Sequence, residues 1–221
     1  VSKEVTAKCG SAHDGINGNN ARASAEGMSY TSVSGSITMD KIAAIGGTAS
    51  GEYSNTSAYA YGSYSEGGTQ DYGEMTMSDV EATAGDSPYA SALAFGVSSN
   101  DRSSTTIAAL TANVKATGTT NANATIHLTY AYGISNDDST VNITGAADLT
   151  AKVATTVGYP DTGAYAVLTF GTTSHPAVTN INTVGGNTVK LVGDVVAYSN
   201  GTNNIVLDTE NAYLQGNILN T

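Results

Sequence analysis

Residues 58–69 read AYAYGSYSEGGT, and the first five of them alternate like a strand and end in an aromatic residue followed by glycine. Aromatic-Gly pairs end similar segments at Tyr61-Gly62, Phe95-Gly96, Tyr132-Gly133 and Phe170-Gly171, and a weaker copy, ARASAEGMS, contains Gly27. The five glycines are spaced 35, 34, 37 and 38 residues apart. A period of this length is typical of repeat architectures, in which each repeat forms one supersecondary unit.

Two further markers recur in the same order at nearly the same step. The first is a β-branched residue or leucine two positions before alanine, with copies that begin at Val5, Ile42, Val80, Val114, Leu149 and Val195. The second precedes it and begins at Ile37 (ITM), Met75 (MTM), Val141 (VNI) and Val189 (VKL). Each repeat therefore predicts three short strands, which are separated by clusters of Gly, Asn, Asp and Ser that favour turns.

A unit of this kind cannot bury its own apolar face, so neighbouring units must share one continuous core. We expect an all-β fold: a right-handed parallel β-helix (β-solenoid) of about six imperfect repeats, with residues 1–221 forming a single domain that is a fragment of a longer protein. The repeat length leaves open whether each repeat forms one turn of the helix or nearly two.

The alignment on glycine also separates large residues from small ones. Side chains alternate between the two faces of a strand. Tyr59, Tyr61, Tyr130 and Tyr132 fall on one face, and small residues such as Ala60 fall on the other. We expect the large face to point inward, where like residues stack from one turn to the next.

Composition excludes several functions. The net charge is −11 with only eight Lys and Arg, whereas nucleic-acid binding requires clustered cations, so no nucleic-acid partner is expected. Cys9 is the only cysteine, which rules out an intramolecular disulfide. No apolar run approaches the roughly 18 residues of a transmembrane helix, so this segment is not expected to insert into a membrane. The chain begins at Val1 and lacks a signal peptide, which predicts a processed or excised fragment.

The repeats resemble those of autotransporter passenger domains, which are secreted by the type V route in bacteria. The resemblance rests on AYAYGSYSEGGT, on LTYAYGISNDDSTVNITG at residues 128–145 and, most closely, on GGNTVKLVGDVVAYSNGTNNIVLDTENAYLQGNI at residues 185–218. It implies a right-handed β-helix that is exported and then displayed on the cell surface or released. It also implies a role in adhesion, aggregation or biofilm formation.

No motif in the chain predicts chemistry. Gly85-Asp86-Ser87 resembles the start of a hydrolase nucleophile motif, but Pro88 follows it, and we interpret the segment as a turn. The acidic turn at residues 136–138 (Asn-Asp-Asp) offers oxygen ligands of the type that calcium prefers, yet we interpret it as a solvated turn. The histidines fall in different repeats, at His13, His127 and His175. We therefore expect no catalytic residue, no cofactor and no metal ligand.

Tyrosines supply the candidate contact surface. Six of the thirteen fit the core pattern less well: Tyr30, Tyr53, Tyr64, Tyr72, Tyr89 and Tyr198. Of these, Tyr64 and Tyr198 are our predicted ligand contacts, because an exposed aromatic ring can stack on a carbohydrate or pack on a protein.

These observations favour a non-enzymatic extracellular module, on a bacterial cell surface or secreted, that mediates adhesion or self-association. Its partner would be a host or bacterial surface glycan or protein, or another copy of itself. One alternative is a structural subunit of an extracellular filament, since an uncapped solenoid exposes strand edges. The other is a polysaccharide-active β-helix enzyme, which would need an acid and a base in one cleft. Arg22 and Arg102 lie far apart and have no matching acidic pair.

Overall fold

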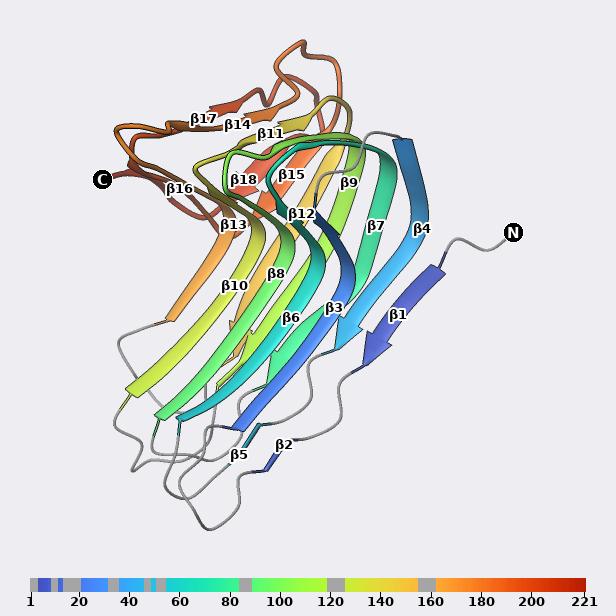
Figure 1. The fold of residues 1–221 in the computed structure, drawn as a ribbon. Helices are drawn as coiled ribbons and strands as arrows, with labels where there is room; N and C mark the ends of the chain where they lie inside the picture. Colours follow the sequence, from blue (N-terminus) through green and yellow to red (C-terminus); the bar gives the residue numbers. More distant parts are fainter. Residues whose placement is uncertain are drawn as a thin grey trace.

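The computed structural model describes residues 4–8, 12–13, 21–31, 36–45, 49–50, 55–83, 89–118, 126–154 and 162–221. All regular structure in these residues is β, and every strand pair is parallel. The expectation of an all-β fold with parallel pairing is therefore confirmed. The strands form two large curled sheets, which Figure 1 shows facing each other.

The first large sheet has seven strands, in the order β19-β16-β13-β10-β8-β6-β3. Their bounds are β3 (Ala21–Thr31), β6 (Asn55–Glu66), β8 (Tyr89–Asn100), β10 (Ile126–Asp137), β13 (Thr162–Gly171), β16 (Asp194–Ser199) and β19 (Ile218–Asn220). This seven-stranded sheet contains the aromatic-Gly segments of the repeat.

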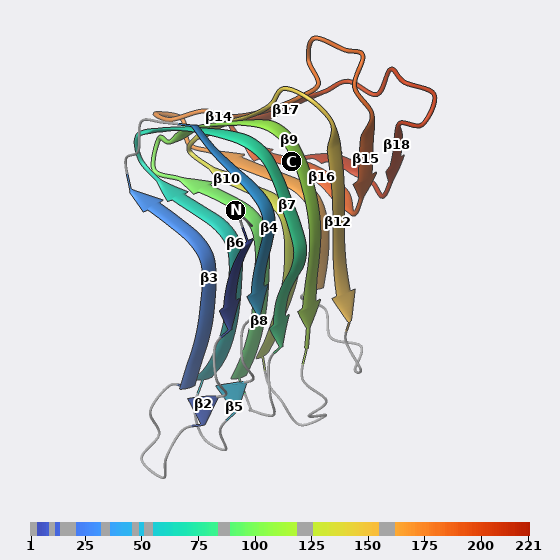
Figure 2. The same ribbon diagram turned by 90° about the vertical axis from the view of Figure 1, so that its right-hand side faces the viewer.

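The second large sheet has ten strands, and Figure 2 shows several of them side by side. They are β1 (Glu4–Lys8), β4 (Ser36–Ile45), β7 (Thr69–Thr83), β9 (Ser104–Thr117), β11 (Thr140–Ile143), β12 (Ala147–Ala154), β14 (Ala177–Ile181), β15 (Val189–Val192), β17 (Gly201–Ile205) and β18 (Tyr213–Gln215). A separate pair is formed by β2 (Ala12–His13) and β5 (Ala49–Ser50).

The chain alternates between the two large sheets, and each strand pairs with the equivalent strand of the next repeat. Tyr61 lies opposite Phe95, and Phe95 lies opposite Tyr132. Residues one repeat apart are therefore direct neighbours, which means that a repeat makes one turn and not two.

The prediction of three strands per repeat holds only toward the C-terminus. In β7 and β9 the first two predicted strands run together as one long strand, whereas β11 and β12 are separate and both pair with β9. Thr144 to Ala146 interrupt the strand there, and Gly145 approaches the carbonyl oxygen of Ala108 too closely for any side chain.

Two parts of the sequence alignment are wrong. Tyr165, and not Phe170, lies opposite Tyr132 in the row of aromatic residues, while Phe170 lies opposite Asp137. Val195 was aligned with Val114, but it belongs to β16 in the seven-stranded sheet. Both errors arise because the turns and loops of later repeats differ in length, so that a marker shifts relative to its neighbours.

The prediction that the large aromatic face points inward is also wrong. Buried alanines line the inner face of the seven-stranded sheet: Ala58, Ala60, Ala92, Ala94 and Ala131 are all 0 % exposed. Tyr59, Tyr61, Tyr130 and Tyr132, on the opposite face, are partly exposed. The large core side chains come from the ten-stranded sheet instead, chiefly Met75, Met77, Ile107, Leu110, Ile143, Leu149, Ile181 and Leu191.

The reason is the small distance between the two sheets. A Cβ added to Gly62 would come within 2.6 Å of the Sδ atom of Met77. Large side chains from one sheet thus face glycine and alanine on the other, and this complementarity gives the core its native packing density. Further along the strands of the seven-stranded sheet, Val97, Ile134 and Val167 add larger side chains to the core.

A buried polar network joins the two sheets beside the turns that connect them. The Thr105 hydroxyl lies 3.2 Å from both the Ser65 and Ser99 hydroxyls. Two repeats further along the chain, the Thr169 hydroxyl lies 2.7 Å from the Thr179 hydroxyl. These bonds pair polar groups that would be costly to bury alone.

Candidate functional site

A row of aromatic rings crosses four strands on the outer face of the seven-stranded sheet. We call Tyr61, Phe95, Tyr132 and Tyr165 the aromatic row. Successive ring centroids are 4.8, 4.8 and 5.3 Å apart, and successive ring planes differ by 5°, 10° and 15°. All four side chains are partly exposed. Parallel strands in register place identical positions at the strand spacing, and that spacing suits stacked rings.

A second file of large side chains lies beside the aromatic row, two residues earlier in each strand. Tyr59 packs against Tyr61 with centroids 6.2 Å apart, and Tyr130 lies 5.9 Å from Tyr132. Leu93 lies between Tyr59 and Tyr130 in the strand register. The two files together form a continuous, partly exposed apolar surface.

Gly163 allows the ring of Tyr165 to contact both the aromatic row and the file of large side chains beside it. It lies opposite Tyr130, and a Cβ at this position would come within 2.6 Å of the Cζ atom of Tyr165. The missing side chain leaves space for the Tyr165 ring, which stacks 6.1 Å from Tyr130 as well as on Tyr132. Tyr165 was not among the residues predicted for this surface. The signal for it in the sequence is its position between two alanines, as in the AYAYG segments.

The predicted ligand contacts Tyr64 and Tyr198 are not brought together. Tyr64 lies on β6, where its ring meets Tyr61 edge-on at 5.5 Å and its hydroxyl donates to Glu66 Oε2 at 3.3 Å. Tyr198 lies on β16, is 52 % exposed and stacks on Phe170 at 5.7 Å. Tyr64 therefore adjoins the aromatic row, whereas Tyr198 lies on a different strand and stacks on Phe170, outside the row.

One of the other candidate tyrosines is corrected by the structure. Tyr72 is only 2 % exposed, because it takes a core position opposite Ile107 in the ten-stranded sheet. Tyr53 and the side chains of Tyr30 and Tyr89 lie outside the described part of the chain.

The acidic segment at the end of β10, residues 136–138, makes structural hydrogen bonds. Asn136 is buried and donates to the backbone of Val178 at 2.9 Å, and Asp138 Oδ1 accepts a bond from the amide of Thr172 at 2.7 Å. Partial burial, and then the neighbouring Asp138 carboxylate, raise the pKa of Asp137 above its ordinary range. Asn136 is thus a buried structural residue and not part of a solvated turn.

The remaining motifs add no chemical centre. Gly85-Asp86-Ser87 and the side chains of His13 and His127 lie outside the described residues. Among the side chains that the structure describes, no three of His, Cys, Asp and Glu gather closely enough to hold a metal ion. Nor does any helix in the described residues have the length and apolar character needed to cross a membrane.

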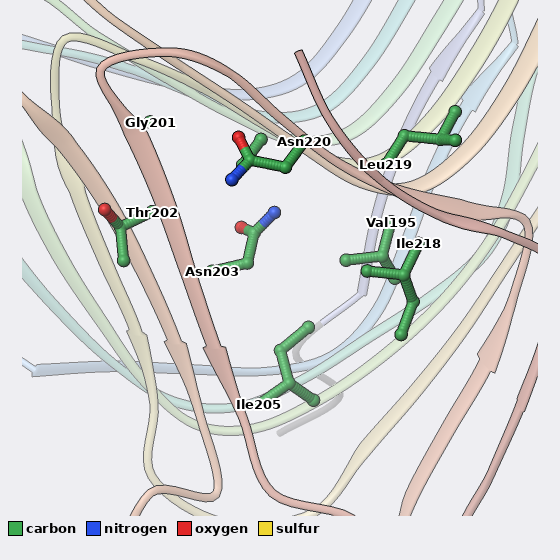
Figure 3. A pocket seen from close by; sticks show the side chains of 9 residues that line it. Val195, Gly201, Thr202, Asn203, Ile205, Ile218, Leu219 and Asn220 are labelled. Atoms are coloured by element: carbon green, nitrogen blue, oxygen red, sulfur yellow. The ribbon is translucent and has the colours of Figure 1, made fainter.

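A hollow of about 330 Å³ lies inside the last coil (Figure 3). Ile205, Val195 and Ile218 line one side of it, and the amides of Asn203 and Asn220 point toward its other side. Ile205 pairs with Ile181 of the core, and Ile218 pairs with Val195. The apolar residues that line the hollow therefore continue the core of the preceding repeats, and the hollow is not a separate ligand site.

Comparison of the chain with protein-family models, with curated proteins and with solved structures gave no match. The aromatic row and the file beside it extend over neighbouring strands of the seven-stranded sheet.

Proposed function

We propose that the chain is a non-enzymatic surface module of the autotransporter passenger type, which acts in adhesion or self-association on a bacterial cell surface or after secretion. In this proposal the parallel coil is a right-handed β-helix, with each repeat of about 35 residues forming one turn. The handedness follows the strong general preference, about 98 %, for right-handed connections between parallel strands.

The observation that carries the proposal is the aromatic row with the file beside it. Contiguous apolar groups on the surface of a soluble protein generally mark contact sites. The rings repeat at the strand spacing, so a partner with its own repeat would meet several equivalent weak contacts. A surface glycan chain and a second copy of this protein are both such partners. Weak contacts that act together give high avidity without a deep pocket.

The test is a binding screen with the purified chain against immobilised glycans and matrix proteins, combined with sedimentation at rising concentration. We expect saturable binding or self-association. A Tyr61→Ser/Tyr132→Ser variant should weaken it by about tenfold or more, because each aromatic contact contributes on the order of 1 kcal/mol.

Tyr213→Ser is the matched control, because it removes a tyrosine that is 45 % exposed on β18, outside the aromatic row, and should change binding little. Tyr198→Ser separately tests the sequence-based prediction of Tyr198 as a ligand contact. A native chain that binds nothing in the screen and stays monomeric would overturn the proposal. Equal behaviour of the row variant and the native chain would remove the aromatic row from it.

A further inference from the structure

Three successive turns between the two sheets stack on one another and border an open depression of about 310 Å³. They lie where β8 leads into β9, β10 into β11 and β13 into β14 (Figure 1). The Arg102 amide donates to the carbonyl oxygen of Asp138 at 3.1 Å, and the Asp138 amide donates to that of Phe170 at 2.9 Å. The third turn is longer, and Thr172 and His175 close it with two backbone bonds of 3.0 and 3.2 Å.

The first two of these turns place residues other than glycine in an unusual backbone conformation, and Asp138 in the second turn has a φ of 51°. Asp101 and Arg102 adopt φ values of 51° and 62°, in the left-handed region that disfavours residues with a side chain. The preceding turn, between β6 and β7, uses Gly67 and Gly68 with φ values of 66° and 72°. An arginine therefore stands where the neighbouring repeat uses glycine. Strained positions of this kind are a reason to look for a function.

The Arg102 side chain is available to a ligand. It is exposed, and its guanidinium makes no hydrogen bond or ion pair with the described residues. A guanidinium carries five donors in a planar fork that matches the two oxygens of a carboxylate. Arg102 thus offers one side of the depression to an anionic group.

The other side of the depression offers groups that bind hydroxyls. Asp138 uses Oδ1 for the amide of Thr172 at 2.7 Å, which fixes its carboxylate in place. Ser174 Oγ lies 3.0 Å from Nδ1 of His175. When Ser174 donates this bond, His175 carries its proton on Nε2, which can then donate to a ligand. The Ser139 hydroxyl also lines the depression and is held by the Ser103 amide at 3.1 Å.

We infer that this depression binds an acidic saccharide unit, with its carboxylate on Arg102 and its hydroxyls on Asp138, Ser174 and His175. The guanidinium of Arg102 supplies the paired donors that a carboxylate needs, and the opposite side of the depression supplies groups that bind hydroxyls. A saccharide that carries both a carboxylate and hydroxyls would use both sides, whereas a neutral sugar or a bare anion would use one. None of these residues belongs to the aromatic row. The inference therefore stands apart from the proposed adhesive surface, and either can fail without the other.

The test is titration of the whole chain with methyl glucuronide, methyl glucoside and inorganic phosphate, followed by NMR shifts of the backbone amides of residues 101–104, 138–140 and 172–176. We expect saturable binding of the glucuronide, at least tenfold tighter than either of the other two, with shifts confined to these three turns. Equal affinity for the glucoside, or for phosphate, would overturn the inference of an acidic saccharide.

Arg102→Gly is the decisive variant. It restores the glycine of the preceding turn, so it should raise the melting temperature by a few degrees while weakening glucuronide binding at least tenfold. Lys115→Gln removes an equal charge from β9, outside the depression, and should leave binding unchanged. If Arg102→Gly retained full affinity, or if Lys115→Gln lost as much, the assignment to Arg102 would be wrong.

Discussion

Gly96 lies directly against the carbonyl oxygen of Gly133, so that a Cβ added to Gly96 would come within 2.6 Å of that oxygen. It would also come within 3.2 Å of the side chains of Ala112 and Val114 on the facing sheet. Gly62 has the same relation to Gly96, at 2.7 Å. Glycine is thus required at these positions of the aromatic-Gly repeat, because the backbone of the next repeat and side chains of the opposite sheet leave no room for a Cβ.

We predict that Gly96→Ala destabilises the protein by about 1–3 kcal/mol, because the obstacle is backbone that cannot rotate away. Urea unfolding followed by circular dichroism measures the loss. Gly186→Ala is the control: no atom lies within 4 Å of its added Cβ, and only its φ of 84° opposes the change, at about 1 kcal/mol. A Gly96→Ala variant as stable as the native chain would contradict the close packing of the two sheets.

The repeat predicted an all-β fold with parallel strand pairing, but not which face of the sheet is buried. Period and order follow from turn residues and alternation, which are local and legible in the sequence. The choice between inside and outside for Tyr61 and Ala60 depends on what faces them. Met77 and its neighbours on the ten-stranded sheet already fill the core, so alanine packs inside and tyrosine stacks outside. That is a property of two segments together, and neither segment reveals it alone.

Three asparagines form a ladder on the outer face of the ten-stranded sheet. Asn180 Nδ2 donates to Asn142 Oδ1 at 2.8 Å, and Asn204 Nδ2 donates to Asn180 Oδ1 at 2.8 Å. We predict that Asn180→Ala costs about 2 kcal/mol in unfolding free energy, since it removes both bonds at about 1 kcal/mol each. Thermal and urea unfolding would measure this cost.

The two ends of the ladder supply matched controls. Asn142→Ala and Asn204→Ala each remove one of the two bonds, so each should cost about half as much as Asn180→Ala. The double variant Asn142→Ala/Asn204→Ala should then resemble Asn180→Ala. If the three single variants had the same free energy of unfolding as one another, the two hydrogen bonds of the ladder would not account for the stability of the native chain.

The sequence also predicted one part of the candidate sites and missed another. Tyr64 was predicted as a ligand contact from its misfit to the core pattern. The structure places it beside Tyr61 of the aromatic row, and its role as a ligand contact stays a prediction. The depression beside Arg102 was not foreseen, because Arg102 and His175 belong to different repeats and come to line one depression only through the stacking of three successive turns. Turn lengths differ between repeats, so spacing in the sequence gives no measure of this proximity.

Asp137 provides a prediction for pH. Burial and then the Asp138 carboxylate raise its pKa in the folded state, so the folded chain holds this proton more tightly than the unfolded chain does. The stabilising contribution is full at pH values below the ordinary aspartate pKa of about 3.9 and is lost as pH rises through the higher folded pKa.

Asp137→Asn abolishes this titration. The free energy of unfolding of the variant, relative to the native chain, should therefore rise as pH increases from about 3.9. Urea unfolding at a series of pH values tests this, and a difference that does not change with pH would contradict it. NMR titration of the Asp137 carboxyl gives an independent check, because Asp138→Asn removes one of the two causes and should lower the pKa of Asp137.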